Sequence, residues 1–428
     1  MKPGRLQGKV ALVVGGGSGM GRAGAVAMAA EGASVAVSDL VRERAEAVST
    51  SITAEGGTAV AMHVDVTSAE LVQRVVAETV SRFGRLDALY HCAADVHFIN
   101  KSDKRLTELE DDVWQRMIDG DGLICLGLAG SLASAGLGPL VAWLVERGYV
   151  DVVASTSANA TEDLLEPRGA RFFQVDPEHV SDAALWQQGF YRFYDHVVSA
   201  REYDRMEDFT SEFFEHLAKT WPSPTIAGVH FTHELGRWLD GRGLTGSLAA
   251  TCFRHGVPLF VPAAPDGPLA EGYRTAARKG PSVDFFRDYE VALDIMSRYM
   301  PPGPGTAAIF AGGGVPKDFI QITATSVAAQ RGNGQASPHV AAIQITTDNT
   351  VFGGLGGAGV HTECISWGKE AAEGRNVMVF ADLTIALPLL CQGLAETYGS
   401  GHVRPARAAI AADLRRALDI SAPSSSHP

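Results

Sequence analysis

The sequence GKVALVVGGGSGMGRA, residues 8–23, decides the fold of the amino-terminal part of the chain. Residues 10–14 form an unbroken apolar run that ends in glycines, which is typical of a strand buried in a parallel sheet. The Ala-rich segment 21–31 that follows has the composition of a helix. Glycines between a strand and a helix permit a tight turn and let the backbone approach a pyrophosphate at the helix N-terminus. The pattern therefore predicts a dinucleotide-binding turn.

Strands and helices alternate outward from this turn. Further strands are predicted at 34–38, 59–64 and 88–92, and helices at 41–55 and 68–83, the latter with Ser68 as N-cap. This βαβαβαβ order predicts one half of a doubly wound parallel sheet.

Two carboxylates end strands of this half-sheet. Asp39 ends the second strand, where it can accept hydrogen bonds from an adenosine ribose and would repel a 2′-phosphate, so NAD is favoured over NADP. Asp65 ends the third strand, near the expected adenine. The predicted cofactor positions of this unit are Gly15, Gly19, Gly21, Asp39 and Asp65.

Residues 7–95 resemble the first half of a short-chain dehydrogenase/reductase, through GKVALVVGGGSGMGRA, HVDVTS and RFGRLDALYHCAA. That family requires a Tyr and, four residues later, a Lys that lowers the pKa of the Tyr for proton transfer. No Tyr-x-x-x-Lys occurs in this chain. The catalytic half of that fold is therefore missing. We interpret the unit as a structural half-domain, and whether it binds NAD stays open.

A second α/β series follows the polar stretch 95–111, which loses the strand rhythm. The predicted organisation is an NAD-binding half-unit at 1–95, a linker at 96–105, a larger domain at 106–400, and a tail at 401–428 with a disordered end. Strands of the larger domain are predicted at 123–128, 151–155, 225–230, 258–262, 307–311, 341–347 and 377–381. Helices are predicted at 137–147, 209–220 and 285–299.

The larger domain contains four specific motifs. They are GGGVPK (312–317), QITTD (344–348), FGGLGGAGVHTECISWGK (352–369) and FADLTIALPLL (380–390). Most of the motif segments follow predicted parallel strands, at the edge where α/β sheets bind ligands, whereas SWGK is predicted to precede a helix. Over about 106–399, these motifs resemble deoxyhypusine synthase and its bacterial deoxyhypusine synthase-like relatives. The predicted fold class is α/β, with Rossmann-like parallel sheets covered by helices on both faces.

The resemblance implies an NAD-dependent transferase. In that family NAD removes a hydride from the carbon beside the secondary amine of spermidine, and an enzyme lysine captures the resulting imine. The aminobutyl group then passes to an acceptor amine and the hydride returns. The acceptor is a lysine of a translation factor in deoxyhypusine synthase, and putrescine in related homospermidine synthases.

The resemblance also assigns the residues of the covalent step. Lys369 takes the imine-forming position of the Trp-Gly-Lys motif and must be neutral to attack. Trp367 can lie against an alkylammonium chain. Glu363 and Glu271 match carboxylates that bind substrate amines, although the family has Asp at the second position.

This chain departs from the family at two places in the substrate site. Asp318 stands where the family has a His, and it cannot perform the acid/base role of an imidazole at neutral pH. Gly353–Gly356 replaces an acidic Asp-Gly-Ser-Asp loop. Asp318 restores one negative charge and is retained as a substrate-binding candidate, but the identities of donor and acceptor stay open.

The family's NAD contacts carry over to positions that follow predicted strands. Small residues there let a cofactor approach, and hydroxyls and carboxylates can bind ribose. These positions are Ser134, Thr156, Glu162, Asp266, Gly312, Gly313, Gly314, Thr347, Ala381 and Asp382. Thr346 is an alternative to Thr347, because the loop length is ambiguous.

Composition excludes several partners. The formal net charge of −13 argues against nucleic acid or an anionic membrane. Five scattered cysteines without a CxxC pair, no signal peptide and no apolar run long enough to span a bilayer predict a cytoplasmic protein. His230 and His233 lack the His-Glu-x-x-His order and a nearby cysteine, so no metal is predicted.

Three functions stay open. The first is NAD-dependent transfer of an aminoalkyl group from a polyamine-like donor through Lys369, in a homo-oligomer, a tetramer or a dimer, as the resemblance implies. The second is a short-chain dehydrogenase-type oxidoreductase, which the missing Tyr/Lys pair opposes. The third is an inactive NAD-binding protein. Trapping of substrate on Lys369 by borohydride separates the first from the other two.

Overall fold

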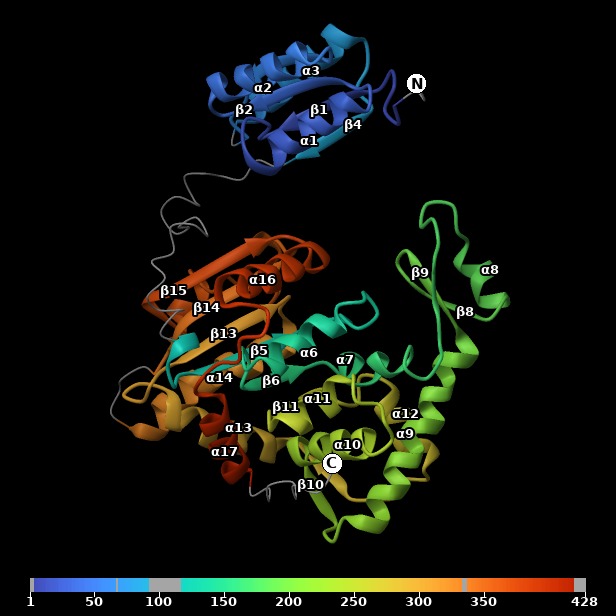
Figure 1. Cartoon of the computed structure of the whole chain (residues 1–428), viewed down its shortest axis with the longest axis vertical. Helices are drawn as coiled ribbons and strands as arrows, with labels where there is room; N and C mark the ends of the chain where they lie inside the picture. Colours follow the sequence, from blue (N-terminus) through green and yellow to red (C-terminus); the bar gives the residue numbers. More distant parts are fainter. Residues whose placement is uncertain (1–3, 67, 92–116, 333–336, 419–428) are drawn as a thin grey trace. The chain divides into compact units, whose positions relative to one another are not determined.

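The computed structural model describes residues 4–66, 68–91, 117–332 and 337–418. The chain forms two compact units, Met1–Arg105 and Leu106–Pro428 (Figure 1). The stretch 92–116, which contains the predicted linker at 96–105, lies outside the described residues, as do residues 419–428, which contain the predicted disordered end of the tail.

The smaller unit is a four-stranded parallel sheet with the order β3-β2-β1-β4. Its strands are β1 (Val10–Val14), β2 (Ser34–Asp39), β3 (Thr58–His63) and β4 (Ala88–His91), and its helices are α1 (Gly19–Ala30), α2 (Arg42–Ala54) and α3 (Ala69–Phe83). Val13 packs in the core under α1 and α2, whereas Leu12 and Val14 pack on the α3 side. The βαβαβαβ order and the Ser68 cap, which accepts a hydrogen bond from Leu71 N, are confirmed.

The larger unit is built on a six-stranded parallel sheet with the order β11-β6-β5-β13-β14-β15. Its strands are β5 (Leu123–Leu128), β6 (Val152–Ser155), β11 (Leu259–Phe260), β13 (Thr306–Ala311), β14 (His339–Thr346) and β15 (Glu370–Phe380). The chain runs from β5 outward to β11 and then returns to β13 on the other side of β5. The order therefore reverses between β5 and β13, and such a switch point is where open α/β sheets bind ligands.

Alternation along β5 divides the core into two layers. Ile124, Leu126 and Leu128 pack on one face of the sheet, and Leu123 and Cys125 on the other. The first face is covered by α6 (Gly138–Glu146), α11 (Leu248–His255) and α16 (Leu383–Tyr398). The second face is covered by α13 (Phe285–Tyr299), α14 (Gly314–Arg331) and α17 (Arg407–Ala417). The predicted fold class, parallel sheets with helices on both faces, is confirmed.

Further elements lie beside this sheet. They are α7 (Ser157–Thr161), η1 (Glu162–Leu164), α8 (Asp182–Gln187), α9 (Ala200–Thr220), α10 (Gly228–Asp240), α12 (Pro268–Thr275), η2 (Thr350–Phe352) and α15 (Glu363–Ser366). An antiparallel sheet joins β7 (Phe172–Gln174), β9 (His196–Ser199) and β8 (Phe190–Phe193), and a parallel pair joins β10 (Thr225–Ala227) to β12 (Ser282–Asp284). The sequence patterns did not predict these two small sheets.

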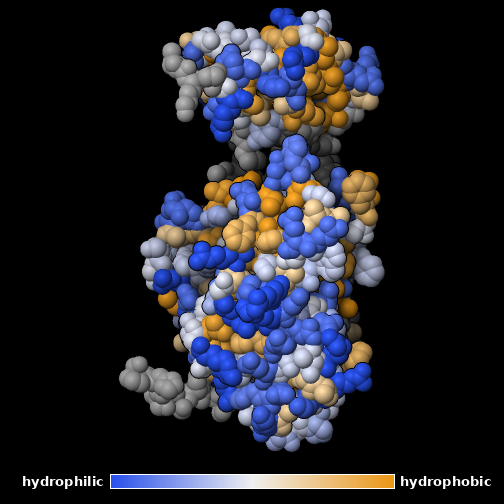
Figure 2. All heavy atoms as spheres, turned by 90° about the vertical axis from the view of Figure 1, so that its right-hand side faces the viewer, coloured by the Kyte–Doolittle hydropathy of each residue, from blue (hydrophilic) through white to orange (hydrophobic). Residues whose placement is uncertain are grey.

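The antiparallel sheet and α8 project from the end of α9 in Figure 1. Figure 2 turns this side of the larger unit toward the viewer and shows apolar side chains in separate patches among hydrophilic ones. Within the described residues, no helix combines the length and the apolar character needed to cross a membrane.

Several predicted elements of the larger unit are wrong in part. The strand predicted at 225–230 ends at Ala227, because the Asp288 carboxylate accepts a hydrogen bond from Val229 N and caps α10. The helix predicted at 209–220 begins earlier, at Ala200. SWGK does not precede a helix. Lys369 is followed directly by β15, and Lys369 O accepts a hydrogen bond from His339 N at 3.0 Å, so pairing with β14 makes the segment a strand.

Candidate active site

A cavity of about 340 Å³ lies at the carboxyl ends of the strands around the switch point. The loops after β5, β13, β14 and β15 line it. Their lining residues are Ala129, Leu132, Ala135, Leu137, Gly312, Gly313, Gly314, Thr346, Thr347, Asp348, Ala381, Asp382, Leu383 and Thr384. The structure therefore brings together the predicted cofactor residues of three separate motifs. Both alternatives, Thr346 and Thr347, line the cavity, the first buried and the second exposed.

The triple-glycine loop forms one wall of this cavity. Gly312 and Gly314 have φ of 84° and 64°, a conformation that side chains other than glycine adopt with strain. A Cβ on Gly313 would stand 2.2 Å from Gly356 Cα, so only glycine fits between the two loops. The 18-residue helix α14 begins at Gly314, and its first backbone N–H groups favour an anion such as a pyrophosphate.

Asp382 lines the cavity as the N-cap of α16. Its Oδ1 accepts hydrogen bonds from Thr384 N at 2.8 Å and Thr384 Oγ1 at 2.5 Å. These hydrogen bonds lower the pKa of Asp382, so the cavity carries a carboxylate that is ionised at neutral pH.

Glu162 is a buried carboxylate held by three hydroxyls. Tyr203 donates to Oε1 at 2.8 Å and Ser134 donates to Oε2 at 2.7 Å, while Ser131 also donates to Oε2. Burial, and next the charge of Glu162, raises the pKa of Tyr203, so this phenol stays a donor. The predicted cofactor residues Ser134 and Glu162 thus contact each other directly. A carboxylate oriented by donors in this way is suited to accept hydrogen bonds from a ribose diol.

The predicted residues Thr156 and Asp266 lie near α7, the short helix that precedes Glu162. Thr156 Oγ1 donates to Gly130 O at 2.6 Å, in the loop that carries Ser134. Asp266 is exposed and precedes Gly267, where a Cβ would stand 2.7 Å from Ser157 Oγ. That buried hydroxyl has no hydrogen-bond partner among the described residues. An unsatisfied buried hydroxyl at this edge of the sheet is consistent with a site for a polar ligand.

Lys369 forms a second centre, together with Asp318 on α14. Its Nζ lies 2.6 Å from Asp318 Oδ1 and 5.7 Å from the centroid of the Trp367 ring. The Lys369 side chain is 14% exposed and that of Asp318 is 36% exposed, whereas Trp367 is 70% exposed. The structure thus brings together three of the predicted catalytic and substrate-binding residues. Asp318 lies one turn into α14, the helix whose first residue, Gly314, lines the cavity.

The buried side chain of Lys317 holds the loop that contains Gly353–Gly356. Lys317 is 1% exposed, and its Nζ donates to Gln344 Oε1 at 2.9 Å and to Leu355 O at 3.2 Å. It also donates to Ala358 O. Burial lowers the pKa of Lys317. The loop Gly353–Gly356 is therefore held by a buried lysine and packed against Gly313.

Glu370, the residue after Lys369, is a buried acid. Its Oε1 accepts a hydrogen bond from Gln321 Nε2 at 2.8 Å, and its Oε2 has no hydrogen-bond partner in the part of the chain that the structure describes. Burial raises the pKa of Glu370 to about 8, although Gln321 and the nearby lysines lower it. This carboxyl is therefore mostly protonated at neutral pH.

The two remaining predicted substrate carboxylates are exposed. Glu271, on α12, pairs with Arg274 Nε at 2.7 Å on the surface. Glu363 begins α15. The structure gives neither of them a contact with Lys369 among the described residues, and their substrate-binding roles stay predictions.

The glycine turn of the smaller unit has the predicted form. Gly15 and Gly19 have φ of 80° and 51°, and a Cβ on Gly21 would stand 2.1 Å from Gly15 O. Asp39 is 9% exposed and accepts hydrogen bonds from Gly17 N at 2.9 Å and from Val41 N at 3.0 Å. Its carboxylate thus holds its own loop. The partly buried Asp65 follows β3, and the cofactor roles of these residues stay predictions.

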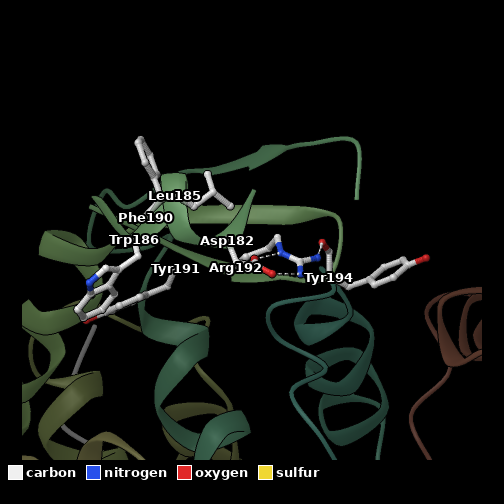
Figure 3. A pocket seen from close by; sticks show the side chains of 7 residues that line it. All are labelled: Asp182, Leu185, Trp186, Phe190, Tyr191, Arg192 and Tyr194. Carbon is white, nitrogen blue, oxygen red and sulfur yellow. Dashed lines mark hydrogen bonds and ion pairs between the residues drawn. The ribbon is translucent and has the colours of Figure 1, made fainter. Parts of the chain in front are cut away.

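A separate pocket of about 530 Å³ lies between α8 and β8 (Figure 3). Asp182 and Arg192 in its wall pair with each other at 2.5 and 2.8 Å, and the rings of Trp186 and Tyr191 stack at 6.2 Å. No predicted site residue lines it. Because its two charged groups pair with each other, we place the candidate site at the switch point.

The sequence motifs contained some of the supporting residues without showing their role. Asn159 accepts from Leu132 N at 2.7 Å and donates to Gly130 O at 3.1 Å, so it shapes the loop after β5. Lys317 and Gln344 lie inside quoted motifs, but their burial was not predicted. Tyr203 and Ser131 lie outside every motif, and no sequence signal marked them.

Comparison with known proteins gives two family matches. The model of deoxyhypusine synthase matches residues 105–394, and the model of short chain dehydrogenase matches residues 9–121. "Probable deoxyhypusine synthase 2" of Archaeoglobus fulgidus is 33% identical over 284 residues, which cover 66% of this chain and 90% of that protein. "Probable deoxyhypusine synthase 2" of Methanosarcina mazei is 32% identical over 285 residues, which cover 66% of this chain and 80% of that protein. A solved structure of a putative deoxyhypusine synthase from Entamoeba histolytica aligns with a TM-score of 0.46 and 16% identity, over 73% of this chain and 88% of that one.

Proposed function

Because this chain belongs to the deoxyhypusine synthase family over residues 105–394, we propose that it is an NAD-dependent aminobutyltransferase. The donor is spermidine or a related polyamine, and the acceptor is an amine. The observation that carries this proposal is the pairing of a largely buried Lys369 with Asp318 at 2.6 Å beside an exposed Trp367.

The cavity at the switch point is proposed to hold NAD. Bound NAD supplies a hydride acceptor that later returns the hydride. Gly313 and the start of α14 fit a pyrophosphate, because they offer backbone N–H groups, and Gly312, whose N–H donates to Ile345 O, adds no side chain to the turn. Glu162 accepts from the ribose hydroxyls, oriented by Tyr203 and Ser134. Further contacts are proposed for the lining residues Gly314, Thr347, Ala381 and Asp382, and for Thr156 and Asp266, which are not among the lining residues.

Lys369 is proposed to carry the aminobutyl group. Its amine attacks the imine carbon of the oxidised donor, the diamine leaves, and the butyl chain stays bound to Nζ as an imine. Trp367 lies against the cationic chain through apolar contact and cation–π attraction. Glu363 and Glu271 are proposed to bind its distal nitrogens.

The acceptor is proposed to be a small amine. Gly353–Gly356 offers no carboxylate to grip further nitrogens, and Lys317 fixes this loop against Gly313. We also propose that the protein works in the cytoplasm as a homo-oligomer, a tetramer or a dimer. Among the described residues, Cys125, Cys252, Cys364 and Cys391 are free thiols, as expected in a reducing compartment.

The test is covalent trapping. The protein is incubated with NAD and spermidine and reduced with borohydride. The mass of the peptide that contains Lys369 is then measured by mass spectrometry. We expect an aminobutyl adduct that is lost in Lys369→Arg and retained in Lys279→Ala, a change at an exposed lysine paired with Glu215. NAD binding without any adduct would overturn the proposal and favour an inactive NAD-binding protein. Net NADH formation with an alcohol would instead favour a short-chain dehydrogenase function, which the match at 9–121 supports.

A further inference from the structure

The amine of Lys369 occupies a cation site that is also suited to a substrate amine. Asp318 Oδ1 lies 2.6 Å from Nζ, and the ring of Trp367 lies 5.7 Å from it. A carboxylate and an indole face are the two groups that bind an alkylammonium most readily. Both partners are accessible, since Asp318 is 36% and Trp367 is 70% exposed, whereas the Lys369 side chain is only 14% exposed.

This arrangement opposes the chemistry that Lys369 must perform. An ammonium group has no lone pair, so a lysine that forms an imine must first lose a proton. The Lys369 amine donates a hydrogen bond to the Asp318 carboxylate at 2.6 Å, so its N–H group is engaged in an ion pair. In the resting site, Lys369 is therefore held by the partner that would also recognise its substrate.

One carboxylate can balance only one cation. A second ammonium placed beside Lys369 and Asp318 would be repelled by the first, and a site that is shielded from water increases this repulsion. The loop Gly353–Gly356 contains no carboxylate that could balance a second ammonium. Glu370, the buried acid next to Lys369 in the sequence, accepts a hydrogen bond from Gln321. Binding of a cationic donor and loss of a proton from Lys369 are therefore coupled.

We propose that Asp318 works as an exchange site, at which the ammonium group of the donor displaces Lys369 and thereby releases its amine. This inference rests on the proposed function. In the exchange, the donor R–NH3⁺ takes the place of Lys369–NH3⁺ on Asp318 and Trp367. Lys369 becomes Lys369–NH2, and one proton passes to water. No bond to carbon changes and no redox partner is needed in this step.

The consequence is substrate selection before any chemistry. A donor with an ammonium group at the Asp318 end activates the lysine, whereas a neutral analogue of the same length leaves it paired. The site selects cationic amines and keeps Lys369 unreactive toward other carbonyl compounds while no donor is bound.

The experiment measures acetylation of Lys369 by a neutral succinimidyl acetate, without NAD and without turnover. The probe is N,N,N′,N′-tetramethyl-1,4-butanediamine, a protonated tertiary diamine that carries N–H donors but gives no stable acyl product. Exposed Lys279 in the same sample serves as the internal reference for reagent consumption. The neutral control is 1,4-dimethoxybutane.

We expect the diamine to increase the labelling rate of Lys369 relative to Lys279 by about fivefold, because this factor corresponds to the free energy that a partly exposed ion pair contributes. The neutral control should have no effect. Asp318→Asn should raise the basal rate by a similar factor and abolish the response to the diamine. Glu373→Gln, at an exposed carboxylate in the same segment, should behave like the unchanged protein.

Protection of Lys369 by the diamine, or an unchanged rate, would overturn the exchange mechanism. An unchanged basal rate in Asp318→Asn would do the same. Labelling and borohydride trapping are independent. An adduct on Lys369 without diamine acceleration removes only this inference, whereas acceleration without an adduct removes the proposed transfer reaction.

Discussion

Glu370 should make the stability of the larger unit fall as pH rises, and Glu370→Gln should remove that dependence. The carboxyl is 1% exposed, one of its oxygens lacks a hydrogen-bond partner among the described residues, and burial raises its pKa to about 8 from an ordinary value of 4.5. Between these two values the folded state binds the proton and the unfolded state does not. Stability from this group is therefore fully present below pH 4.5 and is lost as pH rises through about 8.

The size of the effect follows from the slope of the free energy of unfolding against pH. One proton bound by the folded state alone changes the free energy of unfolding by about 1.4 kcal/mol per pH unit. From pH 5 to pH 7 the wild type should lose at most about 3 kcal/mol through this group. The amide of the Glu370→Gln variant stays neutral, so the variant should gain that amount relative to the wild type over the same range. Buried Asp163 and Asp288, with pKa values raised to about 7, titrate equally in both proteins and cancel in the difference.

The assay is urea unfolding at several pH values, followed by tryptophan fluorescence. All six tryptophans of the chain lie in the larger unit, so the smaller unit does not contribute to the signal. Glu373→Gln, three residues further on and exposed, serves as the matched control and should follow the wild type. If the wild type and Glu370→Gln give parallel curves from pH 5 to pH 8, Glu370 ionises normally and the reasoning from burial is wrong.

Two further predictions concern the proposed NAD site. Tyr203→Phe removes one hydroxyl from the Glu162 carboxylate and should weaken NAD binding by about tenfold in calorimetry, since a hydrogen bond to a charged group contributes about 1.5 kcal/mol or more. The control is Tyr191→Phe, which removes an exposed hydroxyl that contacts Asp204 and should leave the affinity for NAD unchanged. Equal effects of the two substitutions would contradict the role of Tyr203. Gly313→Ala would place a Cβ 2.2 Å from Gly356 Cα. This variant should have a melting temperature lower by several degrees and no measurable NAD binding. Wild-type affinity for NAD in this variant would show that the loops of Gly313 and Gly356 are not packed as described.

The sequence predicted the elements whose signals are local. The apolar run of β1, the glycine turn after it and the Ser68 cap each depend on a few neighbouring residues, and each is present as predicted. The motif GGGVPK likewise placed a tight loop before a helix. Glycines, caps and apolar periodicity act over one turn of the backbone, so they can be recognised without knowing the partners.

The same patterns failed where a distant partner decides the structure. β15 begins directly after Lys369 because its backbone pairs with β14, and nothing in SWGK itself favours a strand over a helix. The β7–β9 sheet consists of three- and four-residue strands, which are too short for a period to be recognised. Tyr203 lies 41 positions from Glu162, and only the fold brings its hydroxyl to that carboxylate.

The sequence by itself determined the α/β class and the family of residues 105–394, and it predicted Lys369 and the triple glycine as site residues, because covalent chemistry and tight turns require particular residue types at fixed spacing. The tertiary structure decided which charges meet. It paired Asp318 with Lys369, buried Lys317 against the glycine loop and, in the part of the chain that the structure describes, left Glu370 without a counter-charge at hydrogen-bond distance. Such pairings depend on how helices and strands pack across the sheet, and electrostatic energies depend on distance and burial rather than on position along the chain.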